Sequence, residues 1–303
     1  ERLGHATHLD DARGRYIEFA KRTVPQGMTF EGLRVVLDCA HGAAYRVAPA
    51  VLWELGAEVT TIGAAPNGVN INDGFGSTDT AALREAVIQE GADLGVALDG
   101  DADRVILVDE TGREIDGDQL IALIVSDWIE RGNLKGGGVV ATVMSNLGLE
   151  RFVSAIGLTL DRTRVGDRYV VERMRRRGMN LGGEPSGHII LTDFTTTGDG
   201  LLAALQVLTV IAKSGKPASQ ACSMFEPVPQ ILRSVGFRAA DPLNCADVVK
   251  AIQIGEGRLG NTGRLVIRQS GTEPKVRVMA EGDDMDLITS VVQDICAKVE
   301  AAA

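Results

Sequence analysis

Apolar residues along the chain fall into short continuous runs separated by stretches with helical spacing. Leu33–Asp38 and Glu58–Ile62 are apolar runs of strand length. Between them, Tyr45–Leu55 has the spacing of a helix, and Gly56 follows it as a plausible C-cap. The order strand, helix, strand is the unit of a parallel sheet, so we predict an α/β domain here.

The same order recurs later in the chain. Gly138–Val143 is typical of a strand, Leu149–Ile156 of a helix and Leu158–Arg162 of a second strand. The stretch LGAEVTTI at 55–62 parallels IGLTLDRT at 156–163. Any two strand–helix–strand units look alike, but the recurrence favours two related α/β domains.

A long apolar helix is predicted over Gln119–Ile129. It follows Asp116-Gly117-Asp118, and we expect Asp118 to be its N-cap. Another helix is predicted within Thr197–Val210, and the three prolines in Pro217–Pro229 then interrupt the pattern.

The last part of the chain alternates predicted strands with helices. The strands are Ile231–Phe237, Gly263–Ile267 and Lys275–Glu281, and the helices lie near Ala246–Glu256 and Asp286–Val299. The fold class that follows is α/β, with two related domains of mixed or parallel sheet and a smaller α+β C-terminal domain. The predicted ranges are 1–114, 115–224 and 225–303.

Composition and charge narrow the possible functions. The chain has 303 residues and a net charge of −10, which argues against a nucleic-acid surface. Its four cysteines have no metal or redox spacing, and no run of 18 apolar residues or signal-peptide pattern occurs. We therefore expect a cytoplasmic protein that binds neither nucleic acid nor membrane. Because the chain starts at Glu1, we also expect it to be part of a longer polypeptide.

Three carboxylates follow the apolar run Leu94–Leu98 directly. Asp99, Asp101 and Asp103 alternate, and extended backbone would aim their oxygens at one point. Oxygen ligands favour Mg²⁺ over Zn²⁺. A calcium loop of the EF-hand type is excluded, because Arg104 stands where that loop needs glycine. A solvated Asp-rich turn remains the alternative on this stretch alone.

Two other polar loops stand out. Arg268–Arg277 brackets Ser, Gly and Thr with two guanidinium groups, which is typical of a phosphate site and equally of a hairpin with arginines on its strand faces. The glycine-bounded loop 182–188 carries Glu184, Ser186 and His188 and could bind sugar hydroxyls. The alternatives there are a surface carboxylate and a structural histidine.

Together these loops resemble the α-D-phosphohexomutase superfamily. The stretches are DGDADR (99–104), GEPSGH (183–188) and RQSGTEPKVRV (268–278), in that family's order. The resemblance implies Mg²⁺ at Asp99, Asp101 and Asp103, with Arg104 and His188 as catalytic candidates. It implies a substrate-binding set of Glu184, Ser186, Arg268, Ser270, Gly271, Thr272 and Arg277.

Within the superfamily, the chain looks most like the bacterial enzymes that interconvert glucosamine 6-phosphate and glucosamine 1-phosphate. VGDRYVVERM (165–174) and TTTGDG (195–200) support this. Such enzymes carry a phosphoserine in a TASHNP-like loop, which this sequence lacks, so we expect the missing N-terminal domain of the same polypeptide as a partner. Pro185 also departs from the Gln or Asn of many glucosamine enzymes. The alternatives are a sugar-phosphate-binding fragment without activity, or a mutase for mannose or glucose phosphates.

Overall fold

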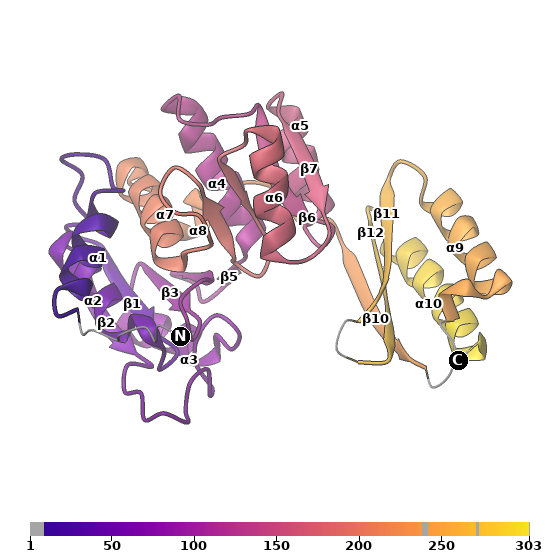
Figure 1. Cartoon of the computed structure of the whole chain (residues 1–303), viewed down its shortest axis with the longest axis horizontal. Helices are drawn as coiled ribbons and strands as arrows, with labels where there is room; N and C mark the ends of the chain where they lie inside the picture. The colour runs from indigo at the N-terminus through magenta and orange to yellow at the C-terminus, as the bar shows by residue number, and fades with distance from the viewer. Residues whose placement is uncertain (1–8, 238–241, 271–272, 303) are drawn as a thin grey trace, which may run out of the picture. The chain divides into compact units, whose positions relative to one another are not determined.

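The computed structural model describes residues 9–237, 242–270 and 273–302 (Figure 1). Contacts divide the chain into two units. Unit 1 comprises Glu1–Thr142 and Leu158–Met224, and unit 2 comprises Val143–Gly157 and Phe225–Ala303. The three sequence ranges given above remain a prediction.

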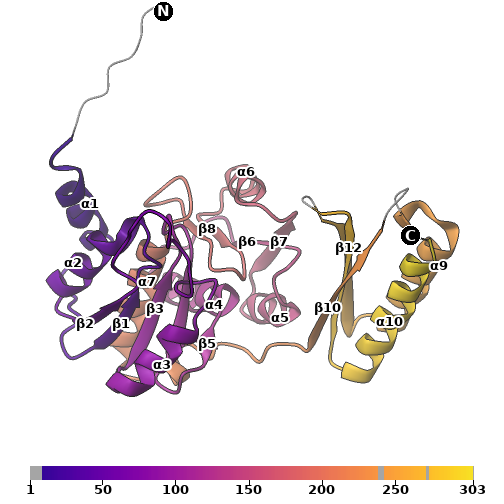
Figure 2. The ribbon, with the colours of Figure 1, turned by 90° about the horizontal axis from the view of Figure 1, so that it is seen from below.

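The first sheet of unit 1 has the order β2-β1-β3-β4-β5. Its parallel strands are β1 (Arg34–Asp38), β2 (Glu58–Ile62) and β3 (Leu94–Leu98), and β4 (Val105–Asp109) and β5 (Glu114–Ile115) add antiparallel pairs. The associated helices are α1 (Ala12–Lys21), η1 (Ala43–Tyr45), α2 (Val47–Glu54) and α3 (Ala81–Glu90). The predicted strand–helix–strand unit is therefore present. Figure 2 shows β2, β1 and β3 side by side.

The second sheet of unit 1 has the order β7-β6-β8-β9. Its strands are β6 (Gly138–Thr142), β7 (Thr159–Thr163), β8 (Leu181–Gly183) and β9 (Ile189–Leu191). The helices of this part are α4 (Gly117–Glu130), α6 (Asp167–Arg177), α7 (Gly200–Ser214) and α8 (Ala218–Ala221).

Helix α7 joins the two sheets of unit 1 into one core. It packs against β3 and β4 of the first sheet, and against β9 and α4 of the second. Its residues from Gly200 to Thr209 are all buried, which accounts for its nearly continuous apolar sequence. The faces of both sheets that meet α7 are therefore held at fixed positions relative to each other.

The start of α4 corrects one expectation. Asp116, and not Asp118, is the N-cap, and its carboxylate accepts a hydrogen bond from the Gln119 amide at 3.1 Å. The helix begins two residues early because the Gly117 amide donates to the Pro185 carbonyl (3.0 Å). Only glycine fits there, since a Cβ would lie 2.2 Å from the Glu184 carbonyl oxygen.

Unit 2 contains an antiparallel sheet of order β10-β12-β11, which confirms the predicted α+β segment. The strands are β10 (Gln230–Gly236), β11 (Gly263–Gln269) and β12 (Lys275–Gly282), and the helices are α5 (Leu147–Ala155), η2 (Pro242–Asn244), α9 (Ala246–Leu259) and α10 (Met285–Ala302). Helices α9 and α10 cover one face of this sheet (Figure 1). Arg264 on β11 ties residues 143–157 to the rest of unit 2 by donating to the carbonyls of Val143 and Ser145 at 2.9 and 2.8 Å.

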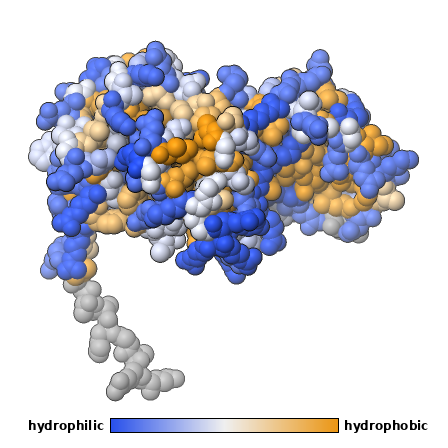
Figure 3. Space-filling model, turned by 90° about the horizontal axis from the view of Figure 1, so that it is seen from above, coloured by the Kyte–Doolittle hydropathy of each residue, from blue (hydrophilic) through white to orange (hydrophobic). Residues whose placement is uncertain are grey.

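On the face shown in Figure 3, hydrophilic residues surround areas of hydrophobic ones. Among the described residues, no helix combines the length and the apolar character needed to cross a bilayer.

Tyr16 on α1 supports the start of α7. Its hydroxyl donates to both oxygens of Asp199, at 3.0 and 2.9 Å, and Asp199 caps α7 through the Leu202 amide. Burial and the Asp199 carboxylate raise the pKa of Tyr16, so the phenol keeps its proton and remains a donor.

We expect Tyr16→Phe to lower the free energy of unfolding by about 1.5–3 kcal/mol, the usual value of a hydrogen bond to a charged group. Denaturant titration followed by circular dichroism measures the change. Tyr45→Phe is the matched control and should have little effect, because no hydrogen bond of the Tyr45 hydroxyl is found among the described residues. Equal stability of the two variants would contradict the role given to Tyr16.

Candidate functional site

The three aspartates lie in the turn that connects β3 to β4. Asp99, Asp101 and Asp103 each offer one carboxylate oxygen, and these oxygens lie within 4.8 Å of one another. Residues 99–104 are a turn and not extended strand, and Ala102 has a positive φ of 62°. The convergence therefore comes from a left-handed residue between two aspartates, not from the strand alternation that was predicted.

Burial makes this turn electrostatically costly without a cation. Asp99 is 7% exposed, and burial, together with the neighbouring carboxylates Asp103 and Asp101, raises its pKa to about 6, although the Arg104 amide partly opposes this. Arg104 Nε lies 3.8 Å from Asp99 and 3.7 Å from Asp103, which offsets part of the charge. The donor set is oxygen only, so it fits a hard divalent cation.

The buried side chain of His188 contacts one of these carboxylates. It is 4% exposed, and its Nδ1 lies 3.1 Å from Asp103 Oδ2. Its Nε2 is buried and has no hydrogen-bond partner among the described residues. Gly198 fits against the ring, because a Cβ there would lie 2.5 Å from it. The geometry suits a group that orients Asp103.

Glu184 and Ser186 lie in the turn between β8 and β9. Glu184 Oε1 accepts a hydrogen bond from the Gly166 amide at 2.9 Å, and Ser186 Oγ lies 3.4 Å from Glu184 Oε2. Ser186 is exposed and Glu184 is half-buried. The Gly166 contact connects this loop to the stretch VGDRYVVERM (165–174), whose first residues are typical of a ligand loop and equally of the start of a helix.

Backbone hydrogen bonds hold the aspartate turn and the following strand against the 184–188 loop and the start of α7. The Val105 amide donates to the Gly187 carbonyl (3.0 Å), and the Gly200 amide donates to the Ala102 carbonyl (2.9 Å). A Cβ on Gly187 would lie 2.0 Å from the Val105 carbonyl oxygen. Carboxylates, imidazole and the Glu184–Ser186 pair thus form a single cluster within unit 1.

The predicted phosphate loop lies in unit 2. Arg268 on β11 and Arg277 on β12 are directly opposite in the antiparallel register. Val276 and Val278 are buried in the core with the helices, so the intervening Arg277 points to the other face of the sheet. An anion placed between these two positions could interact with both guanidinium groups.

The turn that joins these strands is partly described. The Ser270 amide donates to the Lys275 carbonyl at 2.8 Å. Gly271 and Thr272, both predicted to bind phosphate, lie outside the described residues.

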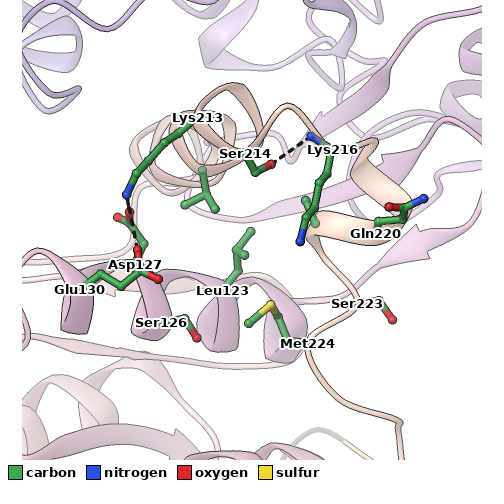
Figure 4. Close-up of a pocket in the computed structure, with 12 residues that line it drawn as sticks. Leu123, Ser126, Asp127, Glu130, Lys213, Ser214, Lys216, Gln220, Ser223 and Met224 are labelled. Atoms are coloured by element: carbon green, nitrogen blue, oxygen red, sulfur yellow. Dashed lines mark hydrogen bonds and ion pairs between the residues drawn. The ribbon is translucent and has the colours of Figure 1, made fainter.

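A cavity of about 480 Å³ lies elsewhere in unit 1, between α4 and the α7–α8 segment (Figure 4). Lys213 reaches across it toward Asp127 and Glu130. It contains none of the residues predicted for the site, so the aspartate turn remains the stronger candidate.

Comparison with protein families gives three consecutive matches. Residues 15–112 match "Phosphoglucomutase/phosphomannomutase, alpha/beta/alpha domain II", residues 116–228 match domain III, and residues 236–298 match the C-terminal domain of that family.

Curated relatives are similar along nearly the whole chain. Phosphoglucosamine mutase of Parvibaculum lavamentivorans is 60% identical over 298 residues, which cover 98% of this chain and 66% of the relative. That of Rhodospirillum centenum is 62% identical over 303 residues, which cover 99% and 64%. The chain thus spans about two thirds of the length of the relatives it matches.

Solved structures share the fold at low identity. A phosphoglucomutase/phosphomannomutase family protein from Burkholderia thailandensis has a TM-score of 0.78 at 20% identity, over 96% of this chain and 64% of that one. N-acetylphosphoglucosamine mutase of Aspergillus fumigatus, in complex with GlcNAc-6P and magnesium, has a TM-score of 0.77 at 21% identity, over 98% and 67%.

We expect Asp101→Asn to weaken divalent-metal binding by at least about tenfold, because it removes one charged oxygen from the cluster. Titration of the 303-residue chain with Mn²⁺, followed by electron paramagnetic resonance, measures the affinity. Asp286→Asn, an exposed position on α10, is the control and should leave the affinity unchanged. Equal affinities of both variants would exclude the aspartate turn as the metal site.

Proposed function

Because the chain belongs to the phosphoglucomutase/phosphomannomutase family, we propose that it carries the metal, sugar and phosphate sites of a phosphoglucosamine mutase. The reaction is the interconversion of glucosamine 6-phosphate and glucosamine 1-phosphate. The observation that carries the proposal is the hydrogen-bonded pairing of the aspartate turn with the 184–188 loop, in a chain about 60% identical to enzymes of that name.

The metal is Mg²⁺ in this proposal, held by Asp99, Asp101 and Asp103. When bound, it supplies positive charge to the transferring phosphoryl group. Arg104 supports the same charge from beside the turn, and His188 acts as a positioning residue by holding Asp103.

Glu184 and Ser186 bind the sugar hydroxyls. Glu184 keeps one carboxylate oxygen on the Gly166 amide, which fixes its orientation, and its other oxygen and the Ser186 hydroxyl face outward together. A fixed acceptor beside a rotatable hydroxyl suits the vicinal hydroxyl groups of a hexose.

Arg268, Ser270 and Arg277, with Gly271 and Thr272, bind the phosphate that is not being transferred. The opposed guanidinium groups suit bidentate recognition of such an anion. This local positive charge matters in a chain whose net charge of −10 repels phosphates at a distance.

The phosphoryl donor implied by the resemblance is a phosphoserine, and the 303 residues contain no TASHNP-like loop to carry it. We propose that it lies on a further domain of the same polypeptide. The phosphoserine gives its phosphoryl group to the free sugar hydroxyl to form a bisphosphate, and the other phosphate then returns to the serine.

The activity of the longer polypeptide tests the proposal. We expect the ratio kcat/KM to be highest for glucosamine 1-phosphate, lower for mannose and glucose 1-phosphates, and turnover by the 303-residue chain alone to be absent. A coupled assay with each sugar phosphate measures this. A higher ratio for mannose or glucose phosphate would reassign the substrate, and turnover by the 303 residues would contradict the missing-donor argument.

We also expect substrate to protect the segment from Gln230 onward. Phosphate held between Arg268 and Arg277 should slow amide exchange in β11 and β12, because both strands are then tied by the same anion. Hydrogen exchange with mass spectrometry, with and without glucosamine 6-phosphate, measures it. Unchanged exchange there would argue against the phosphate site in unit 2.

A further inference from the structure

Asp38, the last residue of β1, accepts hydrogen bonds from two different loops. One carboxylate oxygen accepts from the Ala40 amide at 2.9 Å, and the other accepts from the Gly76 amide at 2.7 Å. The residue is fully buried. The two loops, residues 39–43 and 63–77, are thereby fixed to one side chain.

Each of these loops also reaches the backbone of the aspartate turn. The Ala43 amide donates to the Gly100 carbonyl at 2.8 Å, and the Ser77 amide donates to the Leu98 carbonyl at 3.1 Å. Leu98 directly precedes Asp99, and Gly100 directly follows it. The position of Asp99 is therefore set on both sides by loops that Asp38 anchors.

The two loops pack tightly against the backbone of the aspartate turn. A Cβ on Gly42 would lie 2.3 Å from the Gly100 carbonyl oxygen, and one on Gly76 would lie 2.6 Å from the Leu98 carbonyl oxygen. A displacement of either loop is thus transmitted to the turn directly.

The backbone of these loops is held in unfavourable conformations. Ala40, His41 and Asn72 have positive φ values of 52°, 50° and 58°. With Ala102, they are the non-glycine residues with positive φ in the described part of the chain, and the Asn72 amide donates to the Ala40 carbonyl at 2.9 Å. Such residues persist only where surrounding contacts hold them.

We propose that Asp38 is a positioning residue of the metal centre, which holds the aspartate turn in its metal-binding conformation through the Ala40–Ala43 and Gly76–Ser77 segments. The inference rests on the metal site given under the proposed function. It adds to that site a buried carboxylate, Asp38, that is not itself a metal ligand.

A carboxylate is required at this position because both partners are N–H donors. Asparagine has one acceptor oxygen, and its amide nitrogen would face the second N–H without forming a bond. One of the two loops is then released, and with it one support of Asp99.

The test is Mn²⁺ binding to the 303-residue chain, followed by electron paramagnetic resonance. We expect Asp38→Asn to weaken binding 10–100-fold, the usual effect of losing a group that orients metal ligands. The matched control is Asp93→Asn, because Asp93 accepts from the Arg34 amide (2.8 Å) at the opposite end of the same strand. It should lower the melting temperature without changing the affinity.

A second variant tests the proposal even if Asp38→Asn fails to fold. Ala43→Pro removes the N–H bonded to Gly100, and it stands at the first position of η1, where proline is tolerated. We expect it to weaken Mn²⁺ binding while the circular dichroism spectrum stays unchanged.

The outcomes separate the two proposals. Affinity that is unchanged in folded Asp38→Asn and in Ala43→Pro, while Asp101→Asn loses it, overturns the role of Asp38 and leaves the metal site standing. Wild-type chain that binds no Mn²⁺ overturns both.

Discussion

The close approach of the aspartate turn to the 184–188 loop is the constraint on which the site depends. One backbone hydrogen bond, from the Val105 amide to the Gly187 carbonyl, joins them, and a second, from the Gly200 amide to the Ala102 carbonyl, joins the turn to the start of α7. Gly187 and Gly200 permit these contacts because neither has a Cβ to strike the carbonyls of Val105 and Arg104. The proposed cation ligands and the proposed sugar ligands are thus held relative to each other before any ligand arrives. In phosphoryl transfer, where the protein contributes mainly position and charge, this prior ordering lowers the cost of assembling the reacting groups.

Charge is gathered into two local clusters of opposite sign, one in each unit. In unit 1, three carboxylates converge, and Arg104 offsets them only in part. In unit 2, strand register sets Arg268 against Arg277. Each cluster gathers charge of one sign, so each would interact favourably with an ion of the opposite sign.

The sequence predicted elements better than the contacts that shape them. Apolar runs and turn residues identified β1, β2, β6 and the strands of unit 2, because a strand of this length leaves a local signal in the sequence. The predicted N-cap of α4, Asp118, was wrong. Asp116 is the N-cap because Gly117 contacts a loop some seventy residues later in the chain. Two further features could not be predicted, because neither leaves a periodic signal in the sequence. They are the left-handed conformation of Ala102 and the hydrogen bonds by which Asp38 anchors two loops.

Helix α7 has a consequence for how the protein is made. Residues 200–214 cover β3 and β4, which end at residue 109, so the first sheet lacks part of its cover until α7 has been synthesised. During translation, its nearly all-apolar central strands are exposed to solvent and to other nascent chains. Such long-range closure folds slowly and is open to aggregation in the interval. The packing of α7 on β3 and β4 therefore makes the nascent chain depend on the rapid synthesis of α7, or on a chaperone that covers the sheet until then.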